Sequence, residues 1–236
     1  MGWRDWFRNT QPHLDGPMRL ARSAALGTLK QSKFPNSMEG NQFALAQLWT
    51  EMVLRHYTEI AHLAESENIS IDRVIAARLL RQVCSFYNVL WWYRLHQRIL
   101  DTGRIAQDDI PGYMESFKDA TRVTLVMHPD IPIRPDDMPI FTHPNEMQWD
   151  HDFYTNGSLP NAAEEEDFSI VLKSISQQRD GTFAEIIARL HFRTIQVLDL
   201  SHKLGLMQMQ LWWGLQLEMV EQNMSLILNK LIPVPN

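Results

Sequence analysis

Apolar residues recur at intervals of three and four along most of the chain. This spacing predicts amphipathic α-helices, and capping residues, glycines and prolines mark where each helix begins and ends. The pattern divides the chain into seven helical stretches, of which the fifth is short. We expect helices at about residues 17–31, 40–65, 71–101, 109–128, from 161, 182–205 and 206–231.

The helix expected at residues 71–101 carries two adjacent apolar stripes. We expect Ser70 to cap its first turn and Gly103 to end it. A helix with so wide an apolar face must be covered on more than one side. The first stripe is Ala76, Leu79, Val83, Phe86 and Leu90, and the second is Leu80, Cys84, Tyr87, Trp91, Leu95 and Ile99.

Residues 128–160, called the strap below, show neither helical nor strand periodicity and hold half of the twelve prolines. Long loops in compact domains are usually functional or disordered. The strap has too many apolar residues for a solvated linker. We interpret it as an extended segment, partly polyproline II, that lies on the helical body or on a partner.

These patterns predict an all-α fold, with six or seven helices in one bundle-like domain over residues 1–236. No apolar run approaches the roughly 20 residues that a membrane-spanning helix needs. Within the domain we distinguish an aromatic and basic N-terminal tip, two helical halves and the strap between them. Their ranges are 1–16 for the tip, 17–127 and 161–236 for the halves, and 128–160 for the strap.

Composition and charge limit the classes of function that the chain can have. The net charge of −6 argues against a nucleic-acid partner, because such binding requires a basic surface. Cys84 is the only cysteine, which suits a reducing compartment, and we expect a cytoplasmic protein. Phosphate-binding glycine loops, nucleophile elbows and paired metal-binding cysteines are missing from the sequence, so we expect neither an enzyme nor a cofactor.

Eight tryptophans and twelve methionines exceed what a core of this size usually needs. Both residue types are enriched where proteins bind proteins, so we interpret the chain as a subunit or adaptor of a larger assembly. Trp149 is the expected main anchor. The N-terminal tip is a second contact, either with a protein or with an anionic membrane surface. The expected contact residues are Trp3, Trp6, Phe7, Met147, Trp149, Phe153 and Tyr154.

The main alternative is a metal-binding protein or metalloenzyme, and a further one is a small apolar ligand held between helices. A carboxylate and a histidine three residues apart share one helical face, as in di-iron bundles. The spacing of Glu51, Arg55 and Glu59 is instead typical of ion pairs facing solvent, so we expect no bound metal. The candidate ligand sets are Glu59, His62, Asp199 and His202, or His143, Glu146, Asp150 and His151.

Overall fold

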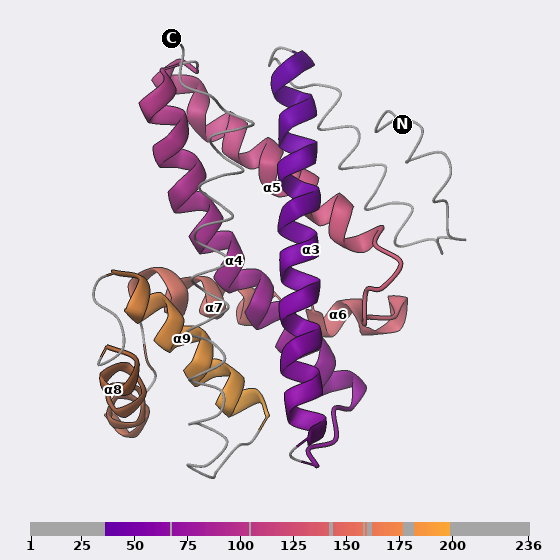
Figure 1. Ribbon diagram of the computed structural model, residues 1–236, viewed down its shortest axis with the longest axis vertical. Coiled ribbons are helices and arrows are strands. Elements are labelled where there is room, and N and C mark those ends of the chain that lie inside the picture. Colours follow the sequence, from indigo (N-terminus) through magenta and orange to yellow (C-terminus); the bar gives the residue numbers. More distant parts are fainter. Residues whose placement is uncertain are drawn as a thin grey trace.

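The computed structural model describes residues 36–198, except for 67, 104, 142–143, 158, 160–161 and 177–181. Within these ranges the regular structure is helical and contains no strand, which confirms the all-α class (Figure 1). No helix of this part is long and apolar enough to cross a membrane. The helices expected at 17–31 and 206–231 and the N-terminal tip lie outside the described residues.

The described helices follow the predicted order. The stretches expected at 40–65, 71–101, 109–128, from 161 and from 182 all appear as helices, with small differences at their ends. The elements are α3 (Asn36–Ser66), α4 (Arg73–Thr102), η1 (Gln107–Asp109), α5 (Ile110–Val126), η2 (Pro135–Asp137), α6 (Met138–Phe141), α7 (Pro144–Asn156), α8 (Ala162–Ser176) and α9 (Thr182–Val197).

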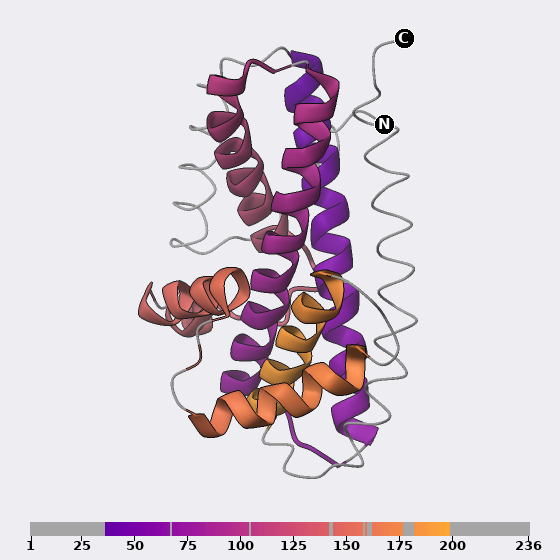
Figure 2. The ribbon, with the colours of Figure 1, turned by 90° about the vertical axis from the view of Figure 1, so that its left-hand side faces the viewer.

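Helix α4 is the central element. Its N-cap is Asp72, whose side chain accepts a 2.8 Å hydrogen bond from the Ile75 amide, so the prediction that Ser70 caps the helix is wrong. Gly103 ends the helix in the left-handed conformation, with φ of 58°, as predicted. Helices α3 and α5 pack along α4, while α6, α7 and α9 contact it from other sides (Figures 1 and 2).

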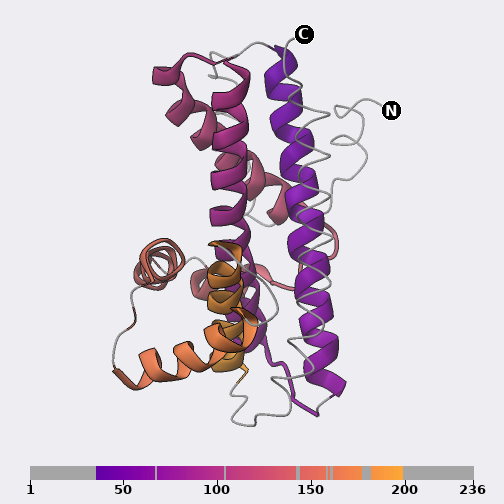
Figure 3. The same cartoon turned by 60° about the vertical axis from the view of Figure 1, so that its left-hand side comes forward.

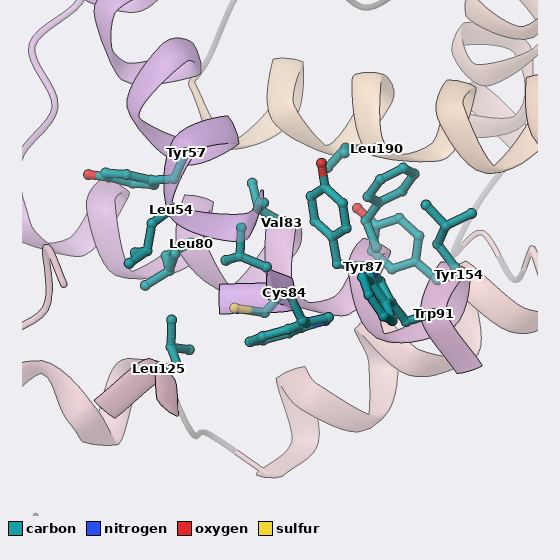
Figure 4. Close-up of a cluster of buried hydrophobic side chains, with 14 of the residues drawn as sticks. Leu54, Tyr57, Leu80, Val83, Cys84, Tyr87, Trp91, Leu125, Tyr154 and Leu190 are labelled. Carbon is teal, nitrogen blue, oxygen red and sulfur yellow. The ribbon is translucent and has the colours of Figure 1, made fainter. Parts of the chain in front are cut away.

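Both apolar stripes of α4 are buried, because different helices cover them. Tyr87 and Trp91 meet Tyr154 of α7 at one end of the core, and Leu80 lies toward the other (Figure 4). The Trp91 ring stacks on Phe117 of α5 at a centroid distance of 5.9 Å. Full burial of side chains of this size stabilises a fold by roughly 1.5–3 kcal/mol each.

Cys84 also lies in this core, as a buried free thiol. Burial raises its pKa, because the apolar surroundings disfavour the charged thiolate. Since the thiolate is the reactive form, Cys84 acts as a small core residue rather than as a nucleophile.

Much of the described strap is helical. Residues 131–134 lack regular structure, but η2, α6 and α7 follow, so the expectation of an extended strap is wrong for residues 135–141 and 144–156. The strap's proline at position 144 does not prevent a helix, because it is the first residue of α7, where no intrahelical amide donor is needed.

Arginines of α4 hold the strap against the helical body. Arg73 forms a 2.8 Å ion pair with Asp137, and Arg81 donates a 2.8 Å hydrogen bond to the carbonyl oxygen of Ile140. Figures 2 and 3 show α7, α8 and α9 gathered around the N-terminal half of α4. The described part of the strap therefore covers the protein's own helices.

Helix α7 ends at Gly157, where a left-handed φ of 70° favours glycine. A Cβ atom at this position would lie 2.8 Å from Nη2 of Arg189, so any other residue would also push this guanidinium aside. Arg189 is 7% exposed and donates from Nη1 to the carbonyl oxygens of Phe153 and Tyr154, at 3.0 and 2.7 Å. It thus joins α9 to the C-terminal end of α7.

Candidate functional site

A buried ionic network joins α4, α7 and α9. Asp150 of α7 is fully buried, and its Oδ2 accepts a 2.7 Å bond from Nε of Arg81. Its Oδ1 accepts from Nε2 of Gln82 at 2.7 Å and from Nη2 of Arg193 at 3.3 Å. Tyr154 adds a hydroxyl that donates to Oε1 of Gln82 at 3.3 Å. Residues of this chain therefore supply the hydrogen bonds to the Asp150 carboxylate, and these bonds fix α4, α7 and α9 together.

Trp149 packs beside this network. Its ring stacks on Phe153 at a centroid distance of 5.5 Å, and the guanidinium carbon of Arg193 lies 3.9 Å from its ring centre. A cation placed so close to an indole face is attracted by the ring quadrupole. Trp149 is only partly buried, so its predicted contact with a partner stays a prediction, but the structure already gives it an intramolecular place.

The structure corrects two of the contact residues expected in the strap. Phe153 is 0% exposed and Tyr154 is 1% exposed, so neither presents a surface to a partner protein. Phe153 belongs to the apolar cluster between α7, α8 and α9, where it meets Phe168 and Phe192, while Tyr154 lies against Tyr87 and Trp91 of α4. Met147 is 40% exposed and remains available. Trp3, Trp6 and Phe7 lie outside the described residues.

The first candidate metal set is not assembled on α3. Glu59 accepts a 3.0 Å hydrogen bond from Nε of Arg55, the pair that their spacing predicted, but its side chain is only 25% exposed and Glu51 pairs with His128 instead. The His62 ring lies 3.5 Å from Glu65, and both side chains are largely exposed. Asp199 and His202 lie outside the described residues.

Two residues of the second candidate metal set have different surroundings. Asp150 is enclosed in the ionic network, while His151 faces solvent on α7. The structure does not describe the side chains of His143 and Glu146. Among the described residues, no three His, Cys, Asp or Glu side chains lie close enough to hold a metal ion. The expectation of a metal-free protein stays a prediction.

An open groove of about 1160 Å³ lies between α4, α5, α7 and α9. Its deeper wall includes buried Leu90, Phe117 and Tyr154. Three large side chains surround it with exposed apolar surface: Trp92 is 44% exposed, Tyr93 59% and Met147 40%. The remaining residues along the groove are Ser85, Asn88, Val89, Arg94, Glu115, Lys118, Arg122, Gln148, His151, Thr155, Glu185, Ile186 and Arg189.

The sequence reasoning missed Trp92 and Tyr93. Neighbouring residues on a helix point about 100° apart, so Trp91 enters the core while the next two side chains leave it. The sequence did contain a signal, because the three consecutive aromatic residues from Trp91 to Tyr93 span more of the helix circumference than either predicted stripe. An aromatic residue that falls outside the core stripes of a central helix is a candidate for a binding surface.

Several charged groups of the groove form pairs along single helices. Lys118 lies 3.3 Å from Glu115, and Arg189 is paired with Glu185. The groove thus combines an apolar and aromatic surface with a charged rim. No protein-family model, curated protein or solved structure matches this chain, so its function is inferred from the geometry of the groove.

Proposed function

We propose that the protein is a non-enzymatic subunit or adaptor that holds a segment of a partner protein in the groove between α4, α5, α7 and α9. The exposed cluster of Trp92, Tyr93 and Met147 around one cavity is the observation that carries the proposal. Single exposed apolar residues are common, but a group around a concave surface is typical of interaction sites. Tryptophan and tyrosine are also the side chains that most often dominate binding energy.

The groove has rigid walls, which supports the proposal. Its α7 wall is tied to α9 by Arg189, and to α4 by the bonds of Asp150 to Arg81 and Gln82. A preformed surface loses little conformational entropy when a partner binds, so more of the contact energy appears as affinity.

The proposal keeps the adaptor function expected from the sequence and moves its main contact surface. Met147 stays in the surface, Trp92 and Tyr93 join it, and Trp149 takes a place beside the ionic network. We expect the partner to be a protein rather than a nucleic acid, and the binding to occur in the cytoplasm. Support for that compartment comes from Cys84, a free thiol of the kind that reducing conditions preserve.

Removing the two exposed aromatic rings is expected to weaken partner binding strongly without unfolding the protein. In the double variant Trp92→Ala and Tyr93→Ala, recovery of a partner from native cells should fall at least about tenfold, equivalent to ~1.4 kcal/mol. The thermal midpoint should change little, because both side chains are exposed. Quantitative mass spectrometry of proteins co-purified with tagged wild type and variant measures the ratio.

The matched control is Ile170→Ala on α8, where an apolar side chain that is 61% exposed lies away from the groove. Its co-purified proteins should equal those of wild type. If the double variant recovers the same proteins in the same amounts as the control, the groove does not bind them and the proposal fails.

A further inference from the structure

We infer that the partner segment is an acidic amphipathic helix, with its apolar face in the groove and its carboxylates against α5. This inference rests on the proposed function and specifies the partner's chemistry. Lys118 and Arg122 lie four residues apart on α5, so they share one helical face along the groove. On the facing side, the described α7 residues that line the groove include Met147 and His151 at the same spacing, and none of them is acidic.

The balance of charge favours an acidic partner. Among the described residues that line the groove, four side chains are cationic, Arg94, Lys118, Arg122 and Arg189, and two are acidic, Glu115 and Glu185. Asp119, which pairs with Arg122 on α5, adds a third acid beside the groove. The whole chain, by contrast, has a net charge of −6. A locally cationic groove in an acidic protein attracts carboxylates and rejects basic segments, since opposed potentials favour association and like charges prevent it.

The cations of α5 are free to change partners. Lys118 and Glu115 are 3.3 Å apart and 45% and 59% exposed, and Arg122 lies 3.3 Å from Asp119 with its own side chain 59% exposed. Exposed pairs within one helix contribute little, so a partner's carboxylates replace them at small cost. Arg189 differs, because buried carbonyl oxygens of α7 fix its guanidinium. The acidic flank of the partner therefore lies on the α5 side.

The α4 wall favours a helical partner over an extended one. Ser85, Val89 and Trp92 are spaced by four and three residues, so they form a ridge about two turns long. Ridges of this kind pack between side chains of a second helix, which then contributes anchors at intervals of three and four residues. The part of the chain described here also contains no strand edge to which an extended peptide could add.

Two labelled model peptides test the inference on the full-length protein. Both are amphipathic helices of about four turns with the same leucine and phenylalanine stripe, and one carries Glu and the other Lys along one flank. Fluorescence anisotropy should show the Glu peptide binding at least about tenfold more tightly, with the difference shrinking as salt rises. Trp92→Ala should weaken binding of the Glu peptide by about tenfold or more.

Two charge variants test whether the partner's carboxylates contact α5. Arg122→Glu should reduce or reverse the preference for the Glu peptide, while Lys173→Glu, an equal charge change at an exposed site on α8, should leave it unchanged. Failure of both peptides to bind, or equal binding of both, would overturn the inference. Equal binding that still requires Trp92 would do so while leaving the proposed function in place, whereas binding insensitive to Trp92→Ala would contradict the groove as the site.

Discussion

Replacing Asp150 by alanine is expected to destabilise the folded protein by about 3–5 kcal/mol. The substitution leaves Arg81, which is 5% exposed, without the carboxylate that its Nε contacts at 2.7 Å. It also leaves the buried amide of Gln82 without its 2.7 Å acceptor. An uncompensated buried charge costs far more than the ion pair itself contributes, which is why the loss should be large.

Urea unfolding monitored by circular dichroism measures this loss. The control is Asp152→Ala, two residues further along α7, whose carboxylate accepts a bond from Gln148 in an exposed setting. That variant should lose no more than about 0.5 kcal/mol. Equal destabilisation by the two substitutions would mean that the network around Asp150 does not hold the helices together.

Acid is expected to destabilise the protein well before its carboxylates become protonated. Burial lowers the pKa of His56 to about 3 and that of His191 to about 4, because a charged ring is poorly solvated inside the core. In the unfolded chain both rings take up a proton below about pH 6.5. The stability from these neutral rings is therefore complete above pH 6.5 and is lost as the pH falls toward the folded pKa values.

The expected size follows from proton linkage. Each histidine contributes up to ~1.4 kcal/mol per pH unit below the unfolded pKa, so both together remove about 4 kcal/mol between pH 7.5 and pH 5. Urea unfolding at pH 7.5 and pH 5 measures the change. His56→Asn should remove about half of the dependence, since an amide stands in for the ring nitrogen 2.9 Å from the Tyr87 hydroxyl without titrating.

The exposed histidine of the same helix provides the control. His62→Ala should leave the pH dependence unchanged, because that ring is 74% exposed in the folded protein. Stability that is the same at pH 5 and pH 7.5, or a slope that His62→Ala reduces as much as His56→Asn, would contradict this account of the buried rings.

The helical architecture was predictable because its determinants are local. The two stripes of α4 follow from spacing alone, and both are buried as the pattern requires. Gly103 could be predicted as the end of α4, because a helix end in the left-handed conformation strongly favours glycine. Helix α7 was not predictable because its sequence mixes aromatic and acidic residues without a clean stripe, and because a proline occurs in irregular segments as well as at the first position of a helix.

The site depended on contacts between distant parts of the chain. Asp150 and Arg81 are 69 residues apart, and no local pattern pairs a carboxylate with an arginine at that separation. Asp150 therefore resembled a metal ligand beside other acids and histidines. Phe153 resembled a surface anchor for the same reason, since an apolar residue in a strap gives no indication of whether its own chain or a partner covers it.

The central claim is that the groove receives another protein, and a photo-crosslinking residue at position 93 tests it most directly. The full-length chain carries benzoylphenylalanine in place of Tyr93, or of Ile170 as the matched exposed position on α8, and is irradiated in native cells. The account predicts one discrete crosslinked partner from position 93, lost when Trp92→Ala is added, and no such product from position 170. Crosslinks from position 93 that stay within the chain, join two copies of it, or match those from position 170 would contradict the account.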